Sequence, residues 1–105
     1  MKRIVIGVAL AAAAISQVYA ADMMALAQSK NCLACHAIDK KLVGPSYEDV
    51  AAKYAGKPGA EAKLVNAVLH GVSGVWGPVP MPANPQVTPA QAKELVQWIL
   101  TLKKK

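Results

Sequence analysis

The feature that most constrains this chain is the run Cys32-Leu33-Ala34-Cys35-His36, in which a histidine directly follows the second of two closely spaced cysteines. These are the only cysteines in the sequence, so they act together. Three chemistries use such a pair: a disulfide, part of a metal site, and covalent attachment of a cofactor. The rest of the sequence decides among them.

The N-terminus has the pattern of a secretory signal peptide. A positively charged start precedes an apolar run rich in alanine (residues 4–15), and a small-residue cleavage pattern follows at residues 18–20. The apolar run is shorter than the ~20 residues that a membrane-spanning helix needs, which argues against an anchor. We therefore expect cleavage of residues 1–20 after Ala20. Residues 21–105 are expected to form one domain in the periplasm, with no stable membrane association.

The composition limits the partners of the expected mature chain. Removal of Lys2 and Arg3 with the signal peptide lowers the formal charge from +6 to +4 and leaves no arginine. Without arginine, planar bidentate recognition of phosphates and bases is poorly served. Aromatic residues are also too few to build a surface on which bases stack. A nucleic-acid partner is therefore not expected.

The expected domain is small and lacks phenylalanine. At this length, burial of apolar side chains barely offsets an ordering entropy of about 1.5 kcal/mol per residue. A disulfide, a metal or a large apolar cofactor would supply the missing stability. The composition thus favours a chain that folds around something besides its own side chains.

The spacing of apolar residues predicts an all-α chain with about four helices. The first helix is expected to be capped by Asp22 and to run from Met23 into the cysteine motif. The second begins at Ser46, whose hydroxyl can cap it, and ends before the run Gly-Lys-Pro-Gly at residues 56–59.

The third helix is predicted over residues 60–70, and Gly71 is suited to end it. The fourth begins at Thr88, where Thr-Pro-Ala-Gln forms a capping box with proline at the first helical position, and its apolar stripe reaches Leu102. Between these helices, residues 71–87 hold too many glycines and prolines for a regular element. No stretch alternates as a β-strand does.

Cys-x-x-Cys-His is the attachment signature of c-type haem. A redox-active dithiol usually accompanies a βαβ pattern, which this sequence lacks. Zinc would need a further ligand, and the other histidine, His70, lies on a distant helix. In haem attachment, Cys32 and Cys35 each add to a vinyl group of the porphyrin, and His36 is delivered beneath the iron. We therefore favour one covalently attached haem c.

The iron needs a second axial ligand on the side opposite His36. Met81 lies in a proline-rich loop, far enough along the chain to reach the opposite face of a haem. The ordinary role of methionine is to fill gaps in a core. His70 is the competing ligand, although its place at a helix C-terminus already accounts for it. A thioether ligand raises the reduction potential, which suits an electron carrier, so Met81 is favoured.

Residues 22–102 resemble class I monohaem cytochromes c, and closely the short bacterial cytochromes c-551 and c-552 (cytochrome c8). The resemblance implies that Cys32 and Cys35 are the thioether attachments and that His36 and Met81 are the axial ligands. It also implies a small fold of about four helices wrapped around one haem. The segments that carry it are CLACHAIDKKLVGPSYEDVAAKYAG, GVWGPVPMP and VQWILTLK.

The same resemblance implies roles for three residues around the haem. The carbonyl of Pro45 would accept a hydrogen bond from the ligating histidine, Trp76 would donate to a haem propionate, and Asn84 would donate to the methionine sulfur. Loop packing and turn formation are the alternative roles of Trp76 and Asn84. Where the family often has a basic residue that meets a propionate, this chain has Ala67.

These inferences predict a soluble periplasmic carrier of single electrons that is not an enzyme. The resemblance implies a monomer that meets a bc1 complex as donor and nitrite reductase, a terminal oxidase or cytochrome c peroxidase as acceptor. The rivals are a haem-based gas sensor or peroxidase-like protein with an open sixth position, and a haem-free dithiol protein. Docking would use lysines for steering and an apolar rim; these are Lys30, Lys40, Lys41, Lys53 and Lys57, and Leu33, Val43, Pro45, Val79 and Pro80.

Overall fold

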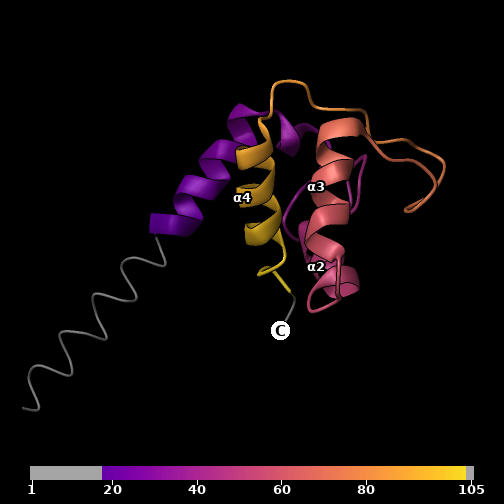
Figure 1. Ribbon diagram of the computed structural model, residues 1–105, viewed down its shortest axis with the longest axis horizontal. Helices are drawn as coiled ribbons and strands as arrows, with labels where there is room; N and C mark the ends of the chain where they lie inside the picture. The colour runs from indigo at the N-terminus through magenta and orange to yellow at the C-terminus, as the bar shows by residue number, and fades with distance from the viewer. Residues whose placement is uncertain (1–17, 104–105) are drawn as a thin grey trace, which may run out of the picture.

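The computed structural model describes residues 18–103, so the expected signal peptide lies almost entirely outside the described residues. In the described part the chain is mostly helical and forms no strand, which confirms the predicted all-α fold. The long loop after α3 extends away from the helices before it returns to the start of α4 (Figure 1). Helical residues 18–29 are followed by η1 (Cys32–Ala34), α2 (Tyr47–Tyr54), α3 (Ala60–His70) and α4 (Pro89–Ile99).

The N-terminal helix, residues 18–29, buries Met23 and Ala27 in the core. Asp22 lies inside this helix rather than at its start, because residues 18–21 are helical as well. The predicted cap at Asp22 is therefore wrong for the chain that still carries its N-terminal segment. The helix ends just before the cysteine motif, as expected.

α2 begins where the sequence predicts. The hydroxyl of Ser46 accepts a hydrogen bond from the backbone N–H of Asp49 at 3.0 Å, which satisfies one of the unpaired donors at the helix start. The predicted apolar face is buried, and it consists of Tyr47, Val50, Ala51 and Tyr54. Two residues of this face, Tyr47 and Val50, also line the cavity described below.

α3 packs against α4, and α2 also contacts α4. The capping box of α4 is present, because Thr88 Oγ1 accepts from the N–H of Gln91 at 3.1 Å and the Gln91 side chain accepts from the N–H of Thr88 at 3.1 Å. A helix fixed at its first turn presents its apolar stripe in a defined direction. The buried stripe is Ala92, Leu95, Val96, Trp98 and Ile99.

The loop between α3 and α4 is held at three points. Val72 and Met81 exchange two backbone hydrogen bonds of 3.0 and 2.8 Å as an isolated β-bridge. Farther along, the N–H of Asn84 donates to a carbonyl of α3 at 3.1 Å. The side chain of Gln86 then donates to the carbonyl of Lys30 at 2.8 Å. A loop rich in glycine and proline is thereby tied to both the third helix and the segment before the cysteines.

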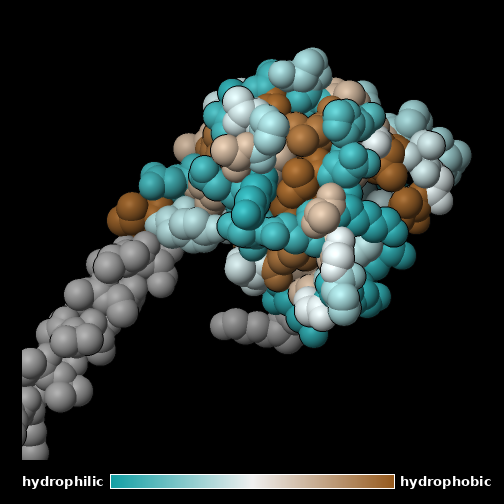
Figure 2. Space-filling model, viewed as in Figure 1, coloured by the Kyte–Doolittle hydropathy of each residue, from teal (hydrophilic) through white to brown (hydrophobic). Residues whose placement is uncertain are grey.

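Apolar side chains also appear between polar ones on the surface (Figure 2). The large ones that are exposed downstream of the cysteines come from two segments far apart in sequence, residues 42–43 and 75–79. Within these segments, Val43 and Val79 are 56% and 60% exposed. Both also line the cavity described next, so the apolar surface follows the edge of that cavity.

Candidate functional site

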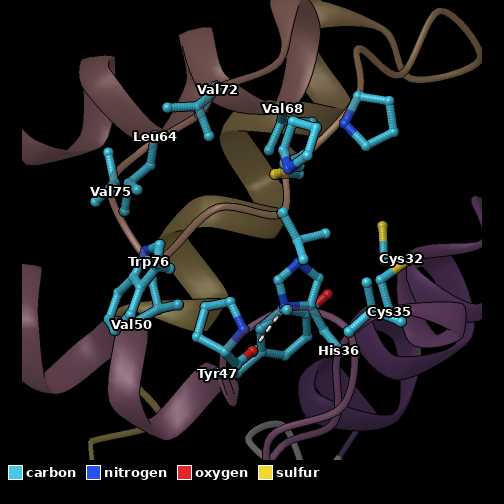
Figure 3. Close-up of a pocket in the computed structure, with 18 of the residues that line it drawn as sticks. Cys32, Cys35, His36, Tyr47, Val50, Leu64, Val68, Val72, Val75 and Trp76 are labelled. Atoms are coloured by element: carbon cyan, nitrogen blue, oxygen red, sulfur yellow. Dashed lines mark hydrogen bonds between the residues drawn. The ribbon is translucent and has the colours of Figure 1, made fainter.

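The helices and the long loop enclose a cavity of about 290 Å³. In Figure 3, the cysteines and His36 lie at one end of it, and Leu64, Val75 and Trp76 lie at the other. The residues that the sequence assigns to the haem site all line this cavity, although they come from distant parts of the chain, whereas the competing ligand His70 does not line it. They are Cys32, Cys35, His36, Pro45, Trp76, Met81 and Asn84, together with Ala67.

His36 is oriented by a hydrogen bond from its ring to the backbone. Nδ1 lies 2.7 Å from the carbonyl oxygen of Pro45, and the bond is drawn as a dashed line in Figure 3. Because a carbonyl oxygen can only accept, Nδ1 carries the proton and donates it. Nε2 is then the nitrogen with a free lone pair, available to bind a metal ion.

Two neighbours fix the plane of the His36 ring. Tyr47 stacks on it with ring centroids 5.1 Å apart and 25° between the planes, and Trp98 meets Tyr47 edge-on at 5.8 Å. Burial raises the pKa of Tyr47, so its hydroxyl stays neutral. At Gly44, a Cβ would lie only 2.6 Å from Cε1 of His36, so the imidazole position requires glycine there. Neither Gly44 nor Tyr47 was predicted to belong to the site, although both lie in the Gly-Pro-Ser-Tyr run that follows the cysteine motif.

Cys32 is the first residue of the short turn η1, and Cys35 directly follows its last residue. The backbone N–H groups of Cys35 and His36 both donate to the carbonyl of Cys32, at 3.2 and 3.1 Å, and this turn lets the thiols and the imidazole share one cavity. Both cysteines are free and half-buried. Burial raises the pKa of the Cys32 thiol.

Met81 is positioned by its backbone. Its bridge with Val72 holds it beside the C-terminal end of α3. At Gly71, φ is 85° and a Cβ would lie 2.8 Å from the carbonyl oxygen of Met81, so both the conformation and the close approach favour glycine. The half-buried side chain of Met81 lines the same cavity as His36.

Asn84 donates its side-chain amide to the backbone. Nδ2 lies 2.9 Å from the carbonyl oxygen of Val68 and 3.3 Å from that of Pro82. Oδ1 accepts from the Gln86 amide at 3.2 Å. Donation from Asn84 to the sulfur of Met81, which the resemblance implies, stays a prediction and would require one of the two Nδ2 bonds to open. The hydrogen bonds of Gln86 were not predicted from the sequence, because no local pattern indicates them.

Trp76 lines the cavity and has a lysine over its ring. The Lys53 ammonium lies 5.3 Å from the ring centroid, which is a cation–π distance. Ala67, which stands where the family often has a basic residue, also lines the cavity and contributes no charge. The positive charge beside Trp76 therefore comes from α2 rather than from α3.

Much of the remaining lining consists of apolar side chains of α2, α3 and α4. Within residues 18–103, no three or more His, Cys, Asp or Glu side chains are grouped so that they could hold a metal ion. An apolar cavity with two thiols and one imidazole at its end fits a flat apolar cofactor that carries its own iron. The apolar lining includes Val50, Leu64, Val68, Leu95 and Ile99.

Sequence comparison agrees with this geometry. A family model for cytochrome c matches residues 12–103. The chain is 52% identical over 85 residues to cytochrome c-551 of Pseudomonas aeruginosa, with 81% of each chain covered. It is 47% identical over 103 residues to cytochrome c-552 of Nitrosomonas europaea, with 98% of this chain and 100% of the relative covered. The chain belongs to the cytochrome c family.

Solved structures extend the match to three dimensions. The crystal structure of Nitrosomonas europaea cytochrome c552 aligns with a TM-score of 0.74 at 51% identity, over 76% of this chain and 99% of that one. The class 1 cytochrome MtoD from Sideroxydans lithotrophicus ES-1 aligns with a TM-score of 0.65 at 38% identity, over 78% of this chain and 94% of that one. The predicted cytochrome c fold is confirmed.

As a cytochrome c, the chain is a small monohaem electron-transfer protein and not an enzyme. Family membership also implies a covalently bound haem c, and the two cysteines agree with this. None of the helices within residues 18–103 has the length and apolar character needed to cross a membrane. The two thiols, the imidazole and the apolar lining of the cavity fit the haem c that the family carries.

Proposed function

We propose that this cytochrome c carries single electrons in the periplasm, with its haem attached through Cys32 and Cys35 and ligated by His36 and Met81. The observation that supports this most is that these four side chains, from two distant segments, line one largely apolar cavity. Iron that alternates between Fe(II) and Fe(III) is the chemistry that haem supplies when bound. Two axial ligands from the chain would leave no position for a substrate, as a carrier requires.

The residues around His36 would keep that ligand in one orientation. The bond to Pro45 would leave Nε2 as the nitrogen that binds the iron, and Tyr47 packs against the ring. Gly44 leaves the space that the imidazole occupies. A ligand restrained on three sides changes position little between oxidation states, which favours fast electron transfer.

Met81 and the cavity walls would set the reduction potential. A thioether ligand raises the potential relative to harder ligands, and apolar walls that exclude water act on it as well. Trp76 would donate to a haem propionate, and the Lys53 ammonium beside its ring would add positive charge there. The side chains of the loop and of α2 would thus act on the same cofactor edge.

Export would follow from cleavage of residues 1–20, leaving residues 21–105 as the mature domain. The charged start, the apolar run and the small-residue pattern at residues 18–20 support this. The alignment with the solved Nitrosomonas europaea structure is compatible with it, since 99% of that chain matches only 76% of this one. Mass spectrometry of the exported protein would test the cleavage position.

A carrier of this kind docks briefly with other redox proteins. We expect a monomer that takes electrons from a donor such as a bc1 complex and passes them to nitrite reductase, a terminal oxidase or cytochrome c peroxidase. Lysines and the apolar edge of the cavity would both contribute to these encounters.

The visible spectrum of the purified holoprotein tests the function. We expect a sharp α-band when the protein is reduced and the weak long-wavelength band of methionine-to-iron ligation when it is oxidised. A five-coordinate spectrum would instead indicate a sensor or a peroxidase-like protein. Absence of a Soret band would indicate a dithiol protein without haem.

A further inference from the structure

Within the loop that carries Met81, the side chains of Asn84 and Gln86 form a chain of hydrogen bonds with two ends. At one end, Asn84 Nδ2 donates to the carbonyl of Val68 at 2.9 Å. At the other end, Gln86 Nε2 donates to the carbonyl of Lys30 at 2.8 Å, across 56 positions of sequence. The two side chains meet where Gln86 Nε2 also donates to Asn84 Oδ1 at 3.2 Å.

The orientation of both amides follows from their partners. Asn84 faces the carbonyl oxygens of Val68 and Pro82, and Gln86 faces that of Lys30. Because a carbonyl oxygen cannot donate, each amide must present its nitrogen there and not its oxygen. Asn84 Oδ1 is then free to accept from Gln86, so every contact in the chain pairs a donor with an acceptor.

The two anchor points belong to opposite parts of the site. Lys30 directly follows the N-terminal helix and lies two positions before Cys32. Val68 lies in α3 and lines the cavity. The backbone strengthens the α3 end, since the N–H of Asn84 donates to the same Val68 carbonyl at 3.1 Å. At the Lys30 end the donor is the Gln86 side chain and the acceptor is the backbone carbonyl of Lys30, so that connection depends on Gln86.

We propose that Gln86 and Asn84 form a clamp that sets how often the loop opens and Met81 leaves its place in the cavity. The clamp ties the loop to the segment that bears the attachment cysteines, and so keeps the two sides of the haem site in register. Gln86 is a positioning residue in this role, acting on Met81 through the loop. The effect on ligation rests on the proposed binding of Met81 to iron.

The size of the effect follows from the exposure of the clamp. Gln86 is exposed, and a hydrogen bond in that setting makes a modest net contribution. Its loss should raise the population of the open loop by about fivefold, without unfolding the domain. A ligand that binds only the open form gains apparent affinity by the same factor, because the competent fraction rises.

Two substitutions at Gln86 separate the clamp from simple loss of contact. Gln86→Ala removes both donations. Gln86→Glu keeps the length of the side chain but places a carboxylate against the carbonyl of Lys30 and Oδ1 of Asn84, which are both acceptors. We expect Gln86→Glu to open the loop at least as much as Gln86→Ala. Gln97→Ala is the matched control, since Gln97 is an exposed glutamine on α4.

The experiment measures loop opening and ligand replacement in the oxidised holoprotein. Amide hydrogen exchange of Met81 and Val72, whose N–H groups form the bridge, should accelerate about fivefold in Gln86→Ala and at least as much in Gln86→Glu. The apparent affinity of the haem for added imidazole should rise by a similar factor. Gln97→Ala should change neither quantity.

The outcomes distinguish the clamp from the function on which it rests. If the unsubstituted holoprotein shows methionine ligation but both Gln86 variants keep its exchange rates and imidazole affinity, the clamp is overturned. If Gln86→Glu behaves as the unsubstituted protein while Gln86→Ala does not, hydrogen bonding is overturned as the cause. If the unsubstituted holoprotein shows no methionine ligation, the proposed ligand set fails, whatever the exchange rates of the loop.

Discussion

The two sides of the haem site are built in opposite ways. On the His36 side, the attachment cysteines, the imidazole and its hydrogen-bond partner all lie within residues 32–45. Short local bonds join them, such as the 2.7 Å bond from the N–H of Gly44 to the carbonyl of Cys35, and Tyr47 packs beneath the ring. On the other side, Met81 lies in a long loop that a backbone bridge and a few side-chain bonds connect to the rest of the chain.

Because of this difference, the two sides should control different properties of the haem site. Contacts that are local and packed around buried rings resist opening, whereas a loop held by a few bonds of about 1 kcal/mol each opens more readily. The His36 side should therefore decide whether the cofactor is held at all. The Met81 side should decide its reduction potential and its access to outside ligands.

The largest effect should come from removing the attachment. In the variant with Cys32→Ala and Cys35→Ala we expect no covalent haem and a largely unfolded chain, because the apolar walls lose the group they pack against. Far-ultraviolet circular dichroism measures this. Ser46→Ala is the control, since it removes only the cap of α2 and should cost about 1 kcal/mol. Native-like helix content in the double variant would contradict the view that attachment holds the His36 side together.

Loss of the Met81 ligand should leave the protein folded but change its redox behaviour. Met81→Ala should lower the reduction potential by tens of millivolts or more, within the range of about 0.8 V that axial ligands span. It should also let carbon monoxide bind the reduced haem. Voltammetry and carbon monoxide difference spectra measure both effects. Met24→Ala in the N-terminal helix is the control, and an unchanged potential in Met81→Ala would exclude Met81 as the ligand.

Two glycines, one on each side, allow a direct comparison. A Cβ at Gly44 would lie 2.6 Å from the half-buried His36 ring, which stacks on Tyr47, so Gly44→Ala should cost about 1–3 kcal/mol of overpacking. A Cβ at Gly71 would lie 2.8 Å from the carbonyl oxygen of Met81 and would add the strain of a φ of 85°. Because the loop can yield, we expect Gly71→Ala to weaken the methionine-to-iron band. We expect it to lower the melting temperature less than Gly44→Ala does.

The same two measurements, thermal unfolding and the oxidised spectrum, apply to both glycine variants. Gly74→Ala is the control, since Gly74 has a φ of 80° but no atom within 4 Å of the added Cβ. It reports backbone strain alone. If Gly44→Ala releases the methionine while Gly71→Ala mainly destabilises the fold, the assignment of a rigid and a soft side is reversed.

Local signals explain how much of the fold the sequence predicted. The caps at Ser46 and Thr88 are present, and α3 occupies the predicted residues 60–70, because each of these features depends on neighbours within one turn. The predicted cap at Asp22 was wrong, because a capping residue lies at the start of a helix and this helix begins earlier. Helix starts are read less securely where a helical pattern continues upstream.

The site divides in the same way. The cysteine motif and the family resemblance pointed to the residues that line the cavity, including Met81 in its distant loop. Gly44 and Gln86 could not be found by pattern, because their importance lies in one approach of 2.6 Å and one bond to Lys30. Neither leaves a periodic or capping signature in the sequence. Such residues become visible only in the three-dimensional contacts of the folded chain.

The smallest expected effect concerns docking, in which the two sides contribute different surfaces. The His36 side supplies both charge and apolar surface at the cavity edge, through Lys41 and Val43, whereas the Met81 loop supplies apolar surface through Val79. If charge dominates, association with an acidic redox partner should slow steeply with salt, because the Debye length falls from ~10 Å at 0.1 M to ~3 Å at 1 M. The expected mature charge of +4 is modest, so we expect a weak dependence, with the apolar edge setting the final geometry and charge changing only the on-rate. Stopped-flow electron transfer across that salt range measures it, with Lys93→Gln on α4 as a charge-matched control for Lys41→Gln. A steep fall that Lys41→Gln removes and Lys93→Gln does not would assign docking to the His36 side instead.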